Sequence, residues 1–215
     1  MLEESAAQAR AMAGKAASRS FLGLAGAPGA GKSALARYLV EEVCAGLGAD
    51  AAAYLPMDGF HLSNAQLDRL GLRDRKGAPD TFDVRGYLAL LRRLHLGGEE
   101  AVFAPDFDRT LDEPIAARIA VEPRVRLVVT EGNYLAADSP LWREVRALLD
   151  DVWYVEADDQ TRESRLVDRQ IAGGRSRTDA LEWVQRLDRT NGEIVKPTRE
   201  NCSRVVGLDE VERLR

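Results

Sequence analysis

Gly26-Ala27-Pro28-Gly29-Ala30-Gly31-Lys32-Ser33 is the stretch that decides the fold, and it matches the pattern GxxxxGK[ST] of a phosphate-binding loop. The short apolar run 20–25 precedes it, and residues 32–45 follow with apolar side chains at helical spacing. A strand, a glycine-rich loop and a helix N-terminus in this order turn successive backbone N–H groups toward phosphate oxygens. The stretch therefore predicts a binding site for a nucleoside triphosphate.

The residues of this loop have different predicted roles. The glycines let the backbone curl, Lys32 reaches the β- and γ-phosphates, and Ser33 holds Mg²⁺. The predicted nucleotide-binding residues of the loop are Gly26, Ala27, Gly29, Ala30, Gly31, Lys32, Ser33 and Ala34. A plain glycine-rich turn is the alternative, and both the strand–loop–helix context and the scarcity of lysine in this chain argue against it.

Strands and helices alternate along the rest of the chain. Apolar or β-branched runs predict strands at 51–55, 125–130, 151–155 and 204–206, and helical patterns cover 84–94, 141–149 and 159–172. This alternation predicts an α/β protein with the P-loop NTPase fold, a doubly wound five-stranded parallel sheet flanked by helices. The expected strand order by chain position is 2-3-1-4-5.

Three smaller features complete the expected organisation. The alanine-rich residues 5–17 predict a helix that packs on the main fold, and residues 101–122 are expected to add a pair of strands over the site. We expect one domain over residues 1–215, with a small lid at about 160–190.

Composition narrows the possible partners. The 215-residue chain has 30 basic and 35 acidic residues and a net charge of −5, which argues against a broad basic surface for nucleic acid. No apolar run is long enough to span a membrane, and charged residues interrupt the first twenty positions. Two cysteines and two histidines are too few for a disulfide scaffold or a zinc cluster. We expect a soluble, cytoplasmic protein with no nucleic-acid or membrane partner; its oligomeric state stays open, a homodimer included.

A triphosphate site does not by itself specify a reaction. A GTPase needs an Asn-Lys-x-Asp-type segment that reads guanine, and no lysine of this chain has aspartate two residues later. An LSGGQ segment, typical of transporter ATPases, is also missing from the sequence. A small-molecule kinase is therefore the simplest class.

Two acidic residues follow predicted strands, at the sheet edge where a γ-phosphate would project. Asp58 suits an acid that orients the acceptor hydroxyl and takes its proton late, and a turn-forming Asp-Gly is the alternative. Glu131 suits a metal-side carboxylate, so Ser33 and Glu131 are the predicted Mg²⁺ residues, and a solvated strand-end acid is the alternative. Nearby residues with either a substrate-contacting or a packing role are His61, Asn133 and Tyr134.

Two arginines point to a lid. Arg165 and Arg169 lie four residues apart on one predicted helix, and such a like-charged pair costs roughly 0.2–0.5 kcal/mol without an anionic partner. The flexible and basic segment 173–177 follows, as in a mobile lid that closes over a triphosphate. We predict that both arginines contact phosphate and act in catalysis with Asp58 and Lys32, and a solvated helix face is the alternative.

These motifs resemble those of the P-loop kinases that include uridine kinase, phosphoribulokinase and bacterial type I pantothenate kinase. The resemblance covers roughly residues 21–206. Asp58-Gly59-Phe60 and the stretch 75–83 look like segments that surround the acceptor in pantothenate kinase, and 165–169 is similar to the lid arginines. The stretches 103–109 and 131–134 look most like a group of small bacterial kinases labelled as nucleoside or nucleotide kinases or as fructose-transport kinases.

The resemblance implies further site residues. Lys76 is implied beside the acceptor, and Asp108 and Arg109 are implied in binding an acceptor hydroxyl or phosphate, with a salt-bridged structural pair as the alternative. Pro197 lies in a Pro-Thr-Arg turn before the last strand, a place implied to be near adenine. The predicted substrate-binding residues are His61, Lys76, Asp108, Arg109, Asn133 and Tyr134.

The sequence thus predicts an ATP- and Mg²⁺-dependent kinase that transfers the γ-phosphate to a hydroxyl of a small metabolite. A sugar, a sugar acid, a pantothenate-like molecule and a nucleoside all stay open as acceptors. A P-loop ATPase that acts as a regulatory or assembly factor is the alternative from another class. A purely structural nucleotide site is disfavoured, because Asp58 and Glu131 both flank the expected γ-phosphate.

Overall fold

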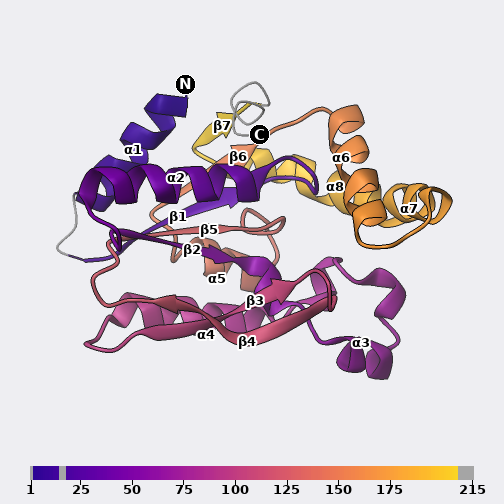
Figure 1. The fold of residues 1–215 in the computed structure, drawn as a ribbon, viewed down its shortest axis with the longest axis horizontal. Helices are drawn as coiled ribbons and strands as arrows, with labels where there is room; N and C mark the ends of the chain where they lie inside the picture. The colour runs from indigo at the N-terminus through magenta and orange to yellow at the C-terminus, as the bar shows by residue number, and fades with distance from the viewer. Residues whose placement is uncertain (1, 15–17, 208–215) are drawn as a thin grey trace.

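Five parallel strands form the main sheet of the computed structural model, which describes residues 2–14 and 18–207 (Figure 1). The strands are β1 (Ser20–Ala25), β2 (Ala52–Pro56), β5 (Leu127–Glu131), β6 (Asp151–Val155) and β7 (Arg204–Val206). They are adjacent in the order β2-β5-β1-β6-β7. Counted along the chain these are the second, third, first, fourth and fifth parallel strands, and the labels run differently because two further strands lie between β2 and β5 in sequence. The α/β fold class is confirmed.

The register of the sheet brings three strand ends to one edge. Leu24 of β1 and Pro56 of β2 both pair with Glu131 of β5, so the carboxyl ends of these strands are level. β5 is buried along its whole length, as expected for a central parallel strand covered on both faces. Side chains that follow these strand ends are therefore held close together on a rigid edge.

Helices cover both faces of the sheet (Figure 1). On one face lie α1 (Leu2–Gly14) and α2 (Lys32–Leu47), and on the other α4 (Val84–Leu96) and α5 (Pro140–Arg146). Each face has its own apolar core, one around Leu22, Leu39 and Trp153 and the other around Phe21, Tyr87 and Trp142. The expected N-terminal helix is present as α1, whose alanines pack against the first core, while positions 15–17 of that prediction lie outside the described residues.

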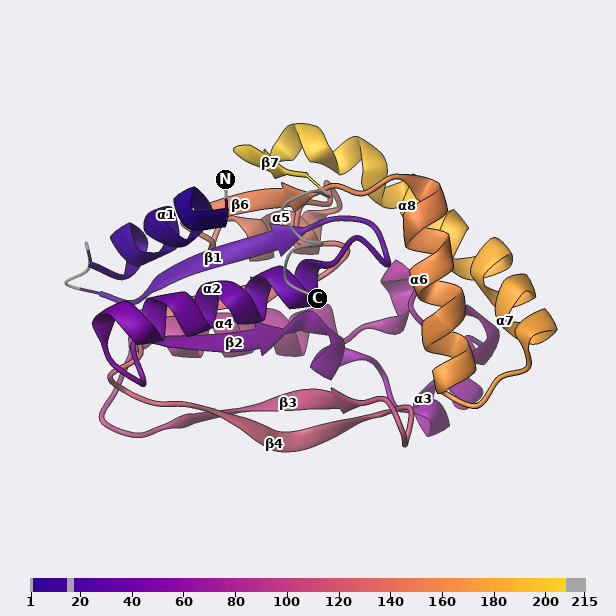
Figure 2. The ribbon, with the colours of Figure 1, turned by 45° about the horizontal axis from the view of Figure 1, so that its top comes forward.

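A separate antiparallel hairpin consists of β3 (Val102–Asp108) and β4 (Glu113–Val121), which confirms the strand pair expected within 101–122. In Figure 2 it lies beyond β2, outside the main sheet. The backbone of the hairpin passes so close to Gly59 that a Cβ there would lie 2.3 Å from the Pro105 carbonyl oxygen. The hairpin therefore packs directly on the segment that follows β2.

The remaining helical segments gather at the carboxyl-end side of the sheet (Figure 2). After β2 come the 3₁₀ turn η1 (Met57–Phe60), α3 (Asn64–Leu70), η2 (Arg73–Arg75) and η3 (Pro79–Thr81). After β6 come α6 (Asp159–Ala172), α7 (Arg177–Trp183), the π-helical turn η4 (Val184–Asp188), α8 (Arg189–Val195) and η5 (Lys196–Asn201). No helix among the described residues is both long enough and apolar enough to cross a membrane.

Candidate active site

The glycine-rich loop 26–31 joins β1 to α2 and has a backbone that only glycine adopts at two close approaches. Gly26 has φ 148° and a Cβ there would lie 2.4 Å from the Val155 carbonyl oxygen, while Gly29 has φ 78° and a Cβ would lie 2.7 Å from the Arg162 carbonyl oxygen. Both neighbours are backbone atoms, which cannot move aside cheaply. The loop is therefore wedged between the end of β6 and the start of α6.

Lys32 begins α2, and its side chain turns back into the loop. Its Nζ donates hydrogen bonds to the carbonyl oxygens of Gly26 (2.9 Å) and Ala27 (3.1 Å) and to Asn133 Oδ1 (2.7 Å). Lys32 is only 6% exposed, and burial lowers its pKa to about 8, although the nearby Glu131 and Asp58 carboxylates act in the opposite direction. Asn133, predicted to contact substrate, accepts a hydrogen bond from the ammonium group of Lys32.

Ser33 and Glu131, the predicted metal residues, lie in direct contact although 98 positions separate them. Ser33 Oγ donates a hydrogen bond of 2.8 Å to Glu131 Oε1, and the Tyr54 hydroxyl donates a second one, also 2.8 Å, to the same oxygen. Burial and the adjacent Glu131 carboxylate raise the pKa of Tyr54, so its hydroxyl stays a donor. Tyr54 was not predicted, and its position on β2, two residues before the strand ends beside Glu131, is the only sequence signal for it.

A hydroxyl and a carboxylate are the hard oxygen donors that Mg²⁺ prefers. The described part of the chain holds no group of three or more His, Cys, Asp or Glu side chains that could bind a metal ion without further ligands. This donor set fits Mg²⁺ that is bound together with a triphosphate, since Mg²⁺ usually takes one or two protein ligands plus phosphate oxygens and water.

Asp58 lies in η1, directly after β2, at the same edge of the sheet as Glu131. Its Oδ2 lies 3.4 Å from Arg109 Nη2 on the turn of the hairpin, and its main-chain oxygen accepts a hydrogen bond of 2.8 Å from His61 Nδ1. Burial alone would raise the pKa of Asp58, but His61, Arg109, Arg169 and Lys32 together lower it below its ordinary value. The carboxylate is therefore ionised in a positively charged surrounding.

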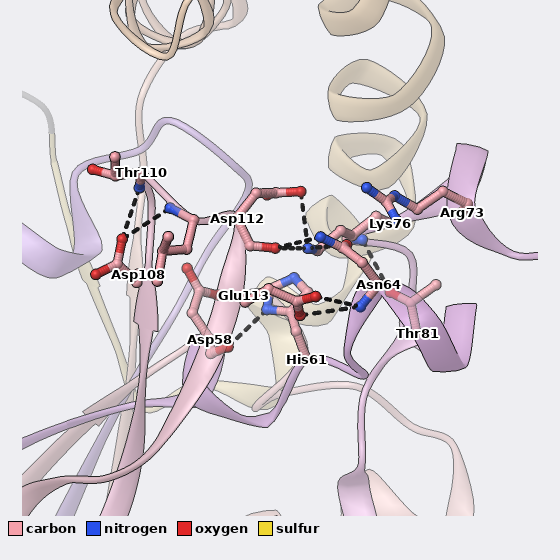
Figure 3. Close-up of polar contacts among 12 residues, drawn as sticks. Asp58, His61, Asn64, Arg73, Lys76, Thr81, Asp108, Thr110, Asp112 and Glu113 are labelled. Atoms are coloured by element: carbon pink, nitrogen blue, oxygen red, sulfur yellow. Dashed lines mark hydrogen bonds and ion pairs between the residues drawn. The ribbon is translucent and has the colours of Figure 1, made fainter. Parts of the chain in front are cut away.

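His61 is packed between two aromatic rings. Its ring centroid lies 4.1 Å from that of Phe82 and 4.8 Å from that of Phe107, and Figure 3 shows its imidazole hydrogen-bonded to the Asp58 backbone. Burial lowers the pKa of His61, and Asp58 opposes this shift. The packing alternative fits His61, because its ring lies between two aromatic rings and its Nδ1 bonds the turn that carries Asp58.

Lys76 joins the segment after α3 to the hairpin turn. Its Nζ donates to Asn64 Oδ1 (2.7 Å), to Asp112 Oδ2 (3.0 Å) and to the Asp112 carbonyl oxygen (Figure 3). It also lies 4.9 Å from the centre of the Phe107 ring. The side chain of Lys76 is 7% exposed. This lysine, predicted to contact the acceptor, fastens two loops together in this structure.

Asp108 and Tyr134, also predicted to contact substrate, both make internal contacts. Asp108 accepts hydrogen bonds from the backbone N–H groups of Thr110 and Leu111, and its Oδ2 pairs with Arg118 Nη1 at 2.6 Å. The structural pair expected as the alternative thus involves Arg118 rather than Arg109. Tyr134 is 1% exposed and donates from its hydroxyl to the Gly77 carbonyl oxygen at 2.7 Å, which places it in the core.

The predicted lid arginines lie on α6, beside the glycine-rich loop. Arg165 Nη1 donates to the Gly29 carbonyl oxygen at 3.3 Å, and Arg169 is exposed one helical turn further on, where its charge reaches Asp58. Arg162, on the preceding turn, is buried and donates to the Pro28 carbonyl oxygen at 2.9 Å while pairing with Asp159 at 2.6 Å. One face of α6 therefore follows the loop along its length.

A cavity of about 240 Å³ adjoins the loop on the side of β6. It is lined by Ala27, Tyr154, Val155, Glu156, Ala157, Arg162, Lys196 and Arg199. Pro197, predicted near the nucleotide base, belongs to η5 between two of these lining residues and does not itself line the cavity.

The chain is similar to known proteins over most of its length. A Schizosaccharomyces pombe protein named "Putative uridine kinase C227.14" is 33% identical over 177 residues, which cover 80% of this chain and 75% of that protein. The Escherichia coli protein YggC is 34% identical over 195 residues, 91% of this chain and 80% of that protein. A Silicibacter crystal structure described as a "putative fructose transport system kinase" superposes with a TM-score of 0.85 at 35% identity, covering 96% of this chain and 98% of that one. No protein-family model matches the chain.

Proposed function

This chain belongs to the family of P-loop small-molecule kinases that includes uridine kinase, phosphoribulokinase and type I pantothenate kinase, and we propose that it transfers the γ-phosphoryl group of ATP to a hydroxyl of a small metabolite. Mg²⁺ is proposed to bind with the triphosphate, where it supplies neutralisation of the phosphate charge.

The contact between Ser33 and Glu131 carries this proposal. The hydroxyl at the start of α2 and the carboxylate at the end of β5 meet at 2.8 Å, beside the buried ammonium group of Lys32. A loop that only wraps a structural phosphate needs no such carboxylate, whereas phosphoryl transfer needs a metal-side acid next to the loop lysine. The pair supports a loop built for a reacting triphosphate.

Asp58 is proposed to orient the acceptor hydroxyl and to take its proton. An aspartate with a lowered pKa is a weak base, which suits a loose transition state in which the proton leaves late. Arg109 pairs with Asp58 at 3.4 Å through an exposed side chain, so an acceptor can displace this contact at small cost.

The lid residues and the cavity are proposed to bind the nucleotide. Arg165 lies against the loop through Gly29, and the charge of Arg169 acts on Asp58, so we propose that the two arginines stabilise the charge on the transferred group from the side of α6. The cavity beside Ala27 is proposed to take the adenine base, with the η5 segment around Pro197 at its border.

The acceptor is proposed to be a polyhydroxylated or hydroxy-acid metabolite or a nucleoside. Uridine appears in the name of one relative and fructose in the description of another, and both carry several hydroxyl groups. Lys76, Asp108, Asn133 and Tyr134 make internal contacts, so Asp58 and Arg109 are proposed as the side chains that meet the acceptor first.

The test is an acceptor-dependent assay. Purified protein is incubated with MgATP and, in turn, D-ribose, D-fructose, uridine, pantothenate, D-glycerate and ribose 5-phosphate, and both ADP and the phosphorylated product are quantified by mass spectrometry. We expect one acceptor to raise ADP formation at least tenfold with stoichiometric product. Steady ADP release that no acceptor changes would contradict the proposal and favour an ATPase.

A further inference from the structure

Asp188 has a feature that the proposed reaction does not explain. It is the last residue of the π-helical turn η4 and is 8% exposed. Its Oδ2 is shielded from solvent and has no hydrogen-bond partner among residues 2–14 and 18–207. A buried carboxylate oxygen without a donor costs free energy comparable to or greater than one lost hydrogen bond, so it calls for a specific explanation.

Cations lie near Asp188 but do not satisfy this oxygen. Burial raises the pKa of Asp188, and the charges of Arg169, Arg162 and Arg175 oppose that shift without cancelling it. Arg162 directs its own hydrogen bonds to Pro28 and Asp159. The charges of arginines on α6 and in the following loop thus act on Asp188, while its Oδ2 has no donor among the described residues.

Two shared neighbours place Asp188 on the same side of the molecule as Asp58. The carboxylates of Asp58 and Asp188 both raise the pKa of Arg169, against the larger effect of its burial. Both also raise the pKa of the Tyr134 hydroxyl, for which burial is the largest cause. That hydroxyl bonds the carbonyl oxygen of Gly77, and a Cβ at Gly77 would lie 3.8 Å from the side-chain amide of Asn191, in the first turn of α8. Asp188 therefore lies where the lid segment meets the loop that carries Lys76.

The helix geometry is a second, independent observation. A π-helical turn inserts an extra residue into a helix, is rare, and is frequent at functional sites. Here the distortion covers Val184–Asp188 and ends at Asp188, whose Oδ2 has no donor among the described residues. The helix distortion and the oxygen without a donor thus coincide at one residue, which is typical of a group that binds a ligand.

Building on the proposed kinase function, we propose that Asp188 Oδ2 accepts a hydrogen bond from the phosphoryl acceptor. The residue then selects an acceptor molecule that carries a neutral donor, a hydroxyl or an N–H, at the end of the molecule that faces α8. An oxygen of the Asp188 carboxyl accepts a hydrogen bond from a hydroxyl or an N–H, whereas an ionised phosphate or carboxylate offers it no donor. Neutral sugars and nucleosides fit this class, whereas sugar phosphates and hydroxy acids must turn their charged end toward Arg109 and Arg169.

The experiment compares Asp188→Leu and Asp188→Asn with the wild type. Leucine keeps the branched shape and the number of side-chain heavy atoms but removes both acceptor oxygens, and asparagine keeps one. With MgATP and D-ribose, D-fructose or uridine, we expect Asp188→Leu to raise the acceptor KM at least tenfold and to change the ATP KM less than twofold. Asp188→Asn should recover part of the loss. The melting temperature of Asp188→Leu without ligand should equal or exceed that of the wild type, because the variant removes an unsatisfied buried group.

Glu182→Gln is the matched control, since it removes an exposed carboxylate from α7 in the same segment and should leave both KM values unchanged. An unchanged acceptor KM in Asp188→Leu, or a lowered melting temperature together with a raised ATP KM, would overturn the inference and make Asp188 a counter-ion of the arginines. Turnover by the wild type with only glycerate, pantothenate or ribose 5-phosphate, at an acceptor KM that Asp188→Leu does not change, would also overturn it while leaving the kinase proposal intact. Wild-type ATP hydrolysis without any phosphorylated product would instead contradict the proposed function itself.

Discussion

The ammonium group of Lys32 is buried beside the Glu131 carboxylate, and burial lowers its pKa to about 8. In the unfolded chain the pKa is near 10.5, so the unfolded state binds more protons than the folded state between about pH 8 and 10.5. The charged form therefore costs stability below pH 8, and this cost fades as the pH rises through that window. The buried charge of Lys32 therefore lowers the stability of the folded chain, as expected of a group whose role is to bind an anionic ligand.

We predict that Lys32→Met abolishes measurable triphosphate binding and raises the melting temperature at pH 7 by about 2 °C or more. The difference in melting temperature from the wild type should shrink toward pH 10, because the wild type then folds without the buried charge. Calorimetric titration with MgATP and thermal unfolding across this pH range measure the two effects. Unchanged ATP affinity in the folded variant would refute the assignment of the loop.

Asp58 is predicted to act on the acceptor rather than on the nucleotide. Asp58→Asn should lower kcat about a hundredfold or more and leave ATP affinity within a few-fold, since the amide cannot take the proton. Because the pKa of Asp58 is lowered, the acid limb of the wild-type rate profile that reports this residue should lie below about pH 4. Asp68→Asn, at an exposed surface pair with Arg73, is the control. Near wild-type turnover in Asp58→Asn would identify Asp58 as a turn residue.

At the scale of single elements, α6 connects the glycine-rich loop to the lid segment. Its N-terminal half is anchored by buried Arg162, while Arg169 near its C-terminal end is exposed. The segment 173–177 that follows is exposed throughout and contains Gly174 with φ 94°. The anchored half and the exposed half should therefore respond differently to a nucleotide.

We predict that a non-hydrolysable ATP analogue slows amide hydrogen exchange over residues 165–190 and leaves the first turn of α6 unchanged. Arg165→Ala and Arg169→Ala should each lower turnover about tenfold or more, with a smaller effect on thermal stability, because they act on phosphate charge. Arg177→Ala, at an exposed position, is the control and should retain activity. Exchange that is the same with and without the analogue would contradict a lid.

At the scale of the whole molecule, the main sheet and the hairpin β3–β4 meet at Gly59. The hairpin turn is tied to the segment after β2 by Lys76 to Asp112 and by Arg109 to Asp58. Gly59, directly after Asp58, allows the Pro105 carbonyl oxygen to come within 2.3 Å of the place where a Cβ would be. The position of the proposed base thus depends on packing between two sheets.

Gly59→Ala should destabilise the protein by about 2 kcal/mol or more, because a backbone oxygen cannot give way to the added methyl group. We also expect a raised acceptor KM, since the hairpin must shift away from Asp58. Gly14→Ala at the end of α1, where a Cβ would meet nothing within 4 Å, is the matched control and should leave stability unchanged or slightly higher. Denaturant unfolding of both variants tests this, and equal stability of Gly59→Ala and the wild type would refute the close approach.

The sequence by itself determined the phosphate-binding loop, the five strand segments and the helices between them. These features depend on short-range physics, namely glycine backbone freedom at Gly26 and Gly29, apolar runs that must be buried, and helical periodicity. Ser33, Glu131 and Asp58 could be placed as well, because parallel strands bring their carboxyl ends to one edge wherever the chain order allows it. The bounds of β1, β6, α6 and β7 match the predicted ranges.

Only the tertiary structure decided what the other polar side chains do. Asn133 holds Lys32 across 101 positions, Tyr134 bonds Gly77 across 57, and Tyr54 reaches Glu131 across 77. A hydrogen bond between residues so far apart depends on side-chain directions and on the packing of whole elements, which no local pattern encodes. Asp188 could not be found from the sequence for the same reason, since a carboxyl oxygen that has no donor among the described residues can be recognised only when the neighbours around it are known.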